Sequence, residues 1–138
     1  MATYLQSART SYFAVKDEAK FRAWIANLDM YIQIVEAPAE KGVFDCLPPP
    51  TALFALMFDP EIGVPSTNQD DEEIDFVAEL STHLAENWVA EIRSIGSEKM
   101  RYLCGFAIIV NSEGDVREVN LDSLDPGELG YFYTDCSY

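Results

Sequence analysis

The sequence predicts one α+β domain in which a mostly antiparallel sheet carries two amphipathic helices on one face. The chain has 138 residues, of which 49% are hydrophobic and 12% aromatic, and this composition can bury a single core. Two segments place apolar residues at helical spacing, while the others are short β-type runs separated by turn residues. Residues 1–138 are therefore expected to form one domain.

The first predicted helix follows a short aromatic and β-branched run at residues 11–15, which predicts a strand. Asp17 is the expected N-cap, because an aspartate side chain can accept from the free N–H groups of the first turn. The helical stripe facing the core, at i, i+3, i+4 and i+7, consists of Phe21, Trp24, Ile25 and Leu28.

The middle of the chain predicts a pair of strands and a loop. Residues 30–35 resume a β-type run, and residues 43–47 are its expected return after a turn. Three prolines at 48–50 end that return strand, since proline has no N–H for a ladder. The apolar run 52–58 fits a strand or a short buried helix, and we favour a strand. Residues 59–69 have the composition of a flexible acidic loop.

A second helix is predicted from about Asp70 to Asn87. At about 100° per residue, its apolar side gathers Ile74, Val77, Leu80, Ser81 and Leu84. The opposite side gathers Asp71, Asp75, Glu79 and Glu86.

The last third of the chain predicts three further strands and an aromatic tail. The strands are expected at 88–93, 100–110 and 116–121, with a turn at 96–99 and a hairpin loop at 111–115. Gly114 suits the left-handed position of that hairpin loop. Residues 125–138 follow a break at Asp125-Pro126-Gly127 and form the tail.

The two halves of the chain share an order of helix, strand, Glu-Lys turn and strand, with the turns at Glu40-Lys41 and Glu98-Lys99. Aligning the helices matches Phe21 with Val77, Trp24 with Leu80 and Leu28 with Leu84. A duplicated helix-plus-hairpin unit and a coincidental likeness both fit this pattern.

Charge is the most unusual property of the chain, because 24 acidic residues stand against 9 Lys and Arg and give a net charge of −15. No Lys or Arg occurs between Gly42 and Ile92. Such a field repels nucleic acid and anionic membrane and attracts basic surfaces. We therefore expect a basic protein partner and no direct binding of nucleic acid or membrane.

The residues capable of chemistry do not form a recognisable catalytic or metal site. Cys46, Cys104 and Cys136 lack the spacing of a disulfide framework or a zinc site, and His83 is the only histidine. A Cys/His enzyme is the alternative, but co-occurrence of these residues is unspecific. The acids at 70–75 do not follow the EF-hand spacing and are more simply explained as helix capping. No Gly-rich loop opens a helix, so nucleotide binding is not indicated either. We expect no enzyme activity, no metal and no cofactor.

The acids on the second predicted helix suggest a binding site. Asp71, Asp75 and Glu79 recur every four residues, about 6 Å apart along a helix, which is near the spacing of phosphates in a nucleic-acid strand. A solvated helix face is the simpler explanation, but it does not account for the missing Lys and Arg, which would stabilise a helix through i,i+4 pairs. The predicted partner-binding residues are Asp59, Glu61, Asp70, Asp71, Glu72, Asp75, Glu79 and Glu86.

Four segments, at 11–17, 21–24, 72–80 and 98–107, resemble a group of uncharacterised acidic proteins of bacterial plasmids and phages. In size and charge the chain is also similar to anti-CRISPR and antirestriction inhibitors. These resemblances imply a non-enzymatic inhibitor, monomeric or dimeric, in the cytoplasm of a bacterial host. It would use a DNA-mimicking acidic surface to block the nucleic-acid-binding channel of a CRISPR effector. The alternative is an immunity protein that neutralises a basic toxin nuclease.

Overall fold

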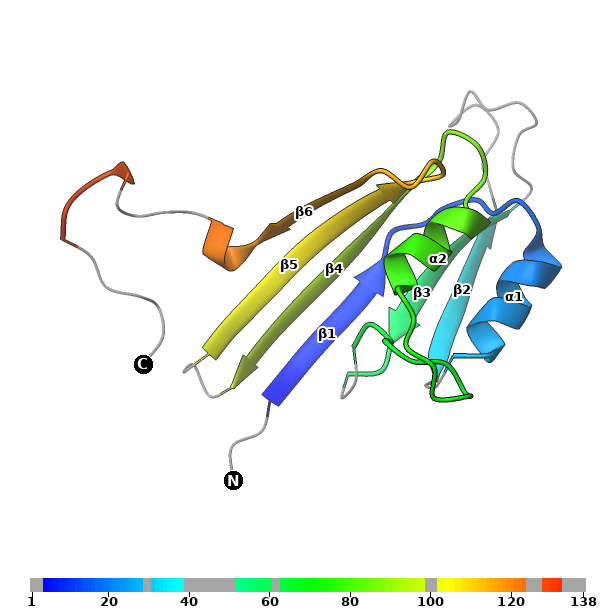
Figure 1. The fold of residues 1–138 in the computed structure, drawn as a ribbon, viewed down its shortest axis with the longest axis horizontal. Helices are drawn as coiled ribbons and strands as arrows, with labels where there is room; N and C mark the ends of the chain where they lie inside the picture. Colours follow the sequence, from blue (N-terminus) through cyan, green and yellow to red (C-terminus); the bar gives the residue numbers. More distant parts are fainter. Residues whose placement is uncertain are drawn as a thin grey trace.

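The structure, a computed structural model, describes residues 4–28, 31–38, 52–60, 63–98, 102–123 and 128–132. Figure 1 shows that the helices lie on one side of the sheet. In chain order the elements are β1 (Tyr4–Thr10), α1 (Glu18–Ala26), β2 (Ile32–Pro38), β3 (Ala52–Phe58), α2 (Phe76–His83), β4 (Val89–Glu98), β5 (Tyr102–Asn111), β6 (Val116–Asn120) and a 3₁₀ turn, η1 (Leu121–Ser123). The predicted α+β fold class is confirmed.

In the described part of the chain the sheet has six strands in the order β2-β3-β1-β4-β5-β6, and its paired strands are antiparallel. β1 lies in the middle and pairs with β4 from Tyr4↔Glu98 to Thr10↔Ile92. Its register with β3 holds the single pair Arg9↔Met57 among the described residues. A side chain supplements this short ladder, since Leu56 donates its N–H to the buried Thr10 hydroxyl at 2.8 Å.

The strand predicted at 11–15 is wrong, because the first strand precedes it. Among the described residues, the β-bridges of residues 11–15 are the isolated pairs Phe13↔Phe54 and Val15↔Leu84. β1 gives a weak sequence signal because Ala8 and Thr10, which are buried among its described side chains, are small or polar.

The first helix confirms its predicted N-terminus. Asp17 is the N-cap, with φ −145° and ψ 107°, and its carboxylate accepts from Lys20 N at 3.1 Å. Phe21 and Ile25 are buried on the predicted stripe, and Leu28 is buried just after the helix.

The second helix is much shorter than predicted, since it begins at Phe76 instead of Asp70. Asp75 is its N-cap, with φ −101° and ψ 96°, and Asp71 has a left-handed φ of 58°. Polar side chains before the helix bind the backbone locally and so compete with helix formation. The predicted helical row of Asp71, Asp75 and Glu79 is therefore wrong, because only Glu79 lies on α2.

The remaining elements mostly follow the sequence. Residues 52–58 form a strand, as favoured. The hairpin between β5 and β6 is confirmed, with Gly114 at φ 92°. β4 continues to Glu98, so the turn predicted from Gly96 begins too early. The return strand predicted at 43–47 lies outside the described residues.

The core lies between the two helices and the sheet (Figure 1). Its fully buried large side chains include Phe13, Phe21, Leu56, Leu80, Leu84 and Ile92. Each such side chain contributes about 1.5–3 kcal/mol through removal from water. Among the described residues, neither helix is long and apolar enough to cross a bilayer.

The sheet has a helix face and an open face. Ala90 and Ile92 of β4 belong to the core under the helices, so the alternating Glu91 and Arg93 lie on the other side. The cross-strand register extends this division to β1, β5 and β6. We call the second side the open face and define it by Arg9, Glu91, Arg93, Ile95, Leu103, Ile109, Arg117 and Val119.

Both halves of the molecule place a helix before an antiparallel strand pair, namely α1–β2–β3 and α2–β4–β5. Leu28 and Leu84, which the repeat aligns, are both buried directly after their helices. The duplication itself stays a prediction.

Candidate acidic binding site

Three of the predicted site residues lie in a tight turn before α2. The side chain of Asn68 organises this turn, because its Oδ1 accepts from Asp70 N at 2.9 Å and from Glu72 N at 3.1 Å. Asp71 N donates to Asn68 O at 3.1 Å, and the left-handed backbone at Asp71 reverses the chain. The carboxylates of Asp70, Asp71 and Glu72 are exposed and make no ion pair with the described residues.

A groove next to this turn brings acids from two parts of the chain together. It measures about 660 Å³ and lies between α2 and the β5–β6 hairpin. Its carboxylates are Asp75, Glu113 and Glu118, and Lys16 is its cation. We call it the acidic groove; the other lining residues are Val77, Ala78, Ser81, Thr82, Ile108, Ser112, Gly114 and Val116.

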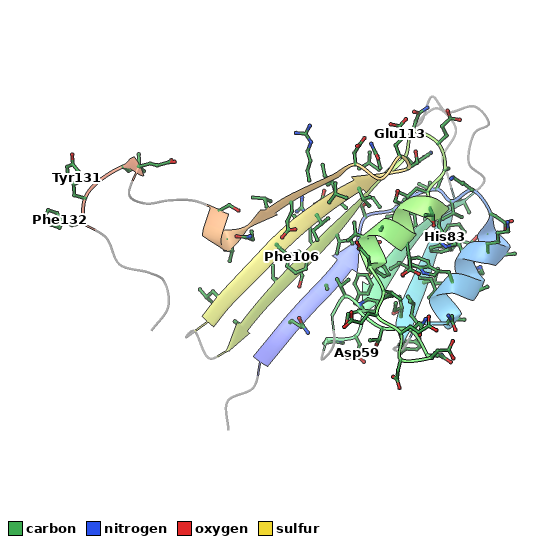
Figure 2. The ribbon with its side chains drawn as sticks, in the orientation of Figure 1. Asp59, His83, Phe106, Glu113, Tyr131 and Phe132 are labelled. Atoms are coloured by element: carbon green, nitrogen blue, oxygen red, sulfur yellow. The ribbon has the colours of Figure 1, made fainter. Side chains whose placement is uncertain are left out.

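Local hydrogen bonds explain why the groove has this shape. Ser81 Oγ on α2 donates to Asn111 O at 2.9 Å and thereby holds the helix against the hairpin. The Asn111 side chain in turn accepts from Glu113 N at 3.0 Å and from Asp115 N at 2.9 Å. These bonds fix the hairpin loop and place Glu113 above the end of α2 (Figure 2).

The strand register places Glu118 on the groove side. Ile108 pairs with Glu118 and Val110 with Val116, and Val110 is fully buried in the core. Val116 and Glu118 therefore lie on the helix face of the sheet. The groove combines carboxylates with the exposed apolar side chain of Val116, which is 49% accessible.

Of the predicted site residues, only Asp75 lines this groove. Its side chain caps α2 by accepting from Ala78 N at 3.2 Å, and it is exposed. Glu86 lies in the turn between α2 and β4. Asp59 is half-buried and lies at the other end of the helices from Glu113 (Figure 2), and Glu61 is outside the described residues.

The carboxylate of Glu79 is hydrogen-bonded to a side chain of the other helix. Trp24 Nε1 on α1 donates to Glu79 Oε1 at 3.2 Å. The Trp24 ring also stacks on His83 at a centroid distance of 4.7 Å and on Phe76 at 5.2 Å. Glu79 thus belongs to the contact between the two helices, and its prediction as an outward-facing acid is wrong.

His83 is part of the same contact. Burial lowers the pKa of its imidazole below the usual 6.5, Glu79 and Asp17 oppose this shift, and Lys16 adds to it. Cys46 and Cys136 lie outside the described residues, so the Cys/His hypothesis is not tested by the structure. Within the described segments, no group of three or more His, Cys, Asp or Glu is placed to hold a metal ion.

The sequence reasoning missed Glu113 and Glu118 as site residues. Both lie in the second acid-rich stretch of the chain, where Arg117 is the one base after Glu113. Pairing the two sides of the predicted hairpin would have put Glu118 in phase with Val116, and this is the signal that could have found it.

Comparison of the chain with models of protein families, with curated proteins and with solved structures found no match.

Proposed function

We propose that this protein is a non-enzymatic inhibitor that binds a basic protein surface through the acidic groove. The proposal depends on one observation, namely that Asp75, Glu113 and Glu118 line the same groove as apolar side chains. Apolar contact removes water from the centre of an interface, and ionic contacts gain strength there.

The charge distribution supports a basic partner. Ion pairs in the described part of the chain join Arg22 to Glu18 and Glu36, and Arg93 to Glu91. None of these pairs uses an acid of the groove or of the turn at 68–73. Those carboxylates can therefore pair with Lys or Arg side chains that a partner brings.

Surfaces rich in Lys and Arg are typical of proteins that bind phosphate backbones. We therefore infer that the partner is a nucleic-acid-binding protein whose channel this chain occupies. A bacterial CRISPR effector complex is the partner class that we propose to test first, in keeping with the resemblance to small acidic inhibitors of bacterial defence.

Competition with DNA tests the proposal. Purified effectors are mixed with labelled target DNA and increasing amounts of the protein at several salt concentrations. We expect displacement of the DNA that weakens steeply as salt rises. The proposal is rejected if no effector able to target the source element binds in a salt-sensitive manner. If a basic toxin nuclease is bound and inhibited instead, the immunity function replaces it.

Two double variants separate the groove from the other acids. Glu113→Lys/Glu118→Lys reverses two groove charges and should weaken binding by at least about tenfold through faster dissociation. Glu72→Lys/Glu86→Lys makes the same charge change at exposed sites outside the groove. It should mainly slow association, since peripheral charges steer encounter. Equal effects of the two variants on dissociation would contradict a binding role of the groove.

A further inference from the structure

The open face of the sheet exposes apolar side chains that a solvated antiparallel sheet would usually replace with polar ones. Ile95 is 67% exposed, Val119 56% and Leu103 47%. They come from three neighbouring strands, β4, β5 and β6. An apolar patch that crosses several strands is typical of an interaction surface.

The open face also has a hollow suited to large side chains. It measures about 400 Å³, and its apolar lining is Ile95, Leu103 and Leu121. The other lining residues are Gln6, Ser7, Gly96 and Ser97. Gly105 makes room for Leu121, since a Cβ at position 105 would lie 3.3 Å from the Leu121 side chain. A glycine in β5 thus lets Leu121, one of the lining side chains, lie close against the sheet.

A matching set of side chains follows η1 in the same chain. Leu129, Tyr131 and Phe132 are 96%, 96% and 99% exposed. Tyr131 and Phe132 stand away from the sheet, beyond β6 (Figure 2). These three side chains bury almost none of their surface against their own chain.

Charge favours contact between these two parts of different copies. Two molecules with a net charge of −15 repel each other over most of their surface. The residues that define the open face include three bases, Arg9, Arg93 and Arg117, and one acid, Glu91. The segment 128–132 carries Glu128 and no base. The open face is thus a surface that an acidic aromatic segment can approach.

We propose that the open face binds residues 128–132 of a second copy of this chain, and that the exchange is reciprocal. Two aromatic side chains and a leucine bury on the order of 500 Å² per segment. With the surface that they cover, two segments reach the roughly 1,200–2,000 Å² of a stable interface. Because the acidic groove lies on the helix face, such a dimer leaves both grooves free.

Sedimentation equilibrium at about 1–100 μM tests the proposal on the whole chain. We expect a mass twice the 15.5 kDa of the monomer. Tyr131→Ser/Phe132→Ser and, separately, Ile95→Glu/Leu103→Glu should each give a monomer with an unchanged circular dichroism spectrum. Tyr31→Ser, which removes a 76% exposed aromatic ring outside the open face, should remain a dimer.

Mixing the two monomeric variants separates exchange between copies from folding of the segment onto its own sheet. The first variant keeps an intact open face and the second keeps an intact segment, so exchange predicts a weak heterodimer. A monomeric wild-type chain, or a dimer that survives both pairs of substitutions, overturns the proposal. Absence of a heterodimer from the mixture also overturns it.

Discussion

Trp24 joins the two helices in two ways, through its stacked ring and through its indole nitrogen. The ring lies against His83 and Phe76 of α2, and the nitrogen donates to Glu79. The sequence predicted that Trp24 faces the core. It did not predict the stacking on Phe76 and His83, because that contact depends on where α2 begins. Trp24 of α1 thus contributes to the position of α2, together with the Ser81–Asn111 hydrogen bond.

A double-mutant cycle measures the hydrogen bond to Glu79. Trp24→Phe keeps an aromatic ring but removes the donor, and we expect a loss of about 1–2 kcal/mol in the free energy of unfolding. With Glu79→Ala and the double variant, urea denaturation should give a coupling energy of about 0.5–1.5 kcal/mol. Strictly additive losses would show that the bond contributes nothing to stability.

His83 makes stability depend on pH. Burial lowers its pKa in the folded protein, so the unfolded chain binds a proton more readily below pH 6.5. The free energy of unfolding should therefore fall as the pH is lowered from 7.5 to 5.5. Glu79 and Asp17 moderate the effect, whereas Lys16 strengthens it.

His83→Phe provides the matched comparison, because it keeps a ring against Trp24 but cannot be protonated. Urea denaturation at pH 7.5 and 5.5 should show a larger loss in the wild-type protein than in this variant. Carboxylates titrate in both proteins, so their effect cancels in the difference. The same loss in both would contradict a lowered pKa of His83 in the folded protein.

The secondary-structure elements were predictable where the apolar pattern was strong. The helical spacing of Phe21, Ile25 and Leu28 predicted α1, and the apolar run of β3 predicted a buried strand. The start of α2 was not predictable in this way, because side chains at Asn68 and Asp75 decide it by binding backbone N–H groups. Helical periodicity continued into a segment that does not form a helix.

Substitution of the competing N-caps checks where α2 begins. Asp75→Ala should lower the free energy of unfolding by about 1 kcal/mol, because it removes the acceptor for Ala78 N. Asp75→Asn should restore most of the loss, and Asp70→Ala should change stability by no more than about 0.5 kcal/mol. These values come from urea denaturation. A larger effect at Asp70 would place the helix start where the periodicity suggested.

The whole molecule separates its charge by face in a way that composition alone could not reveal. The negative charge of the chain was evident from the sequence, but the site was predicted on the second helix and on the loop before it. The acidic groove instead depends on the register between Ile108 and Glu118, which unites residues far from Asp75 in sequence. Sequence patterns report the acids along each segment, whereas the site is formed by tertiary contacts.

The central position of β1 has a consequence for the order in which the sheet can form. β2 and β3, like β4 and β5, can pair as near neighbours in sequence, whereas Tyr4 of β1 must find Glu98. Pairing over such a separation closes a long loop, and contacts of this kind slow folding. The pairs β2–β3 and β4–β5 can therefore form first as separate antiparallel units. The insertion of β1 between them then joins both units in one sheet.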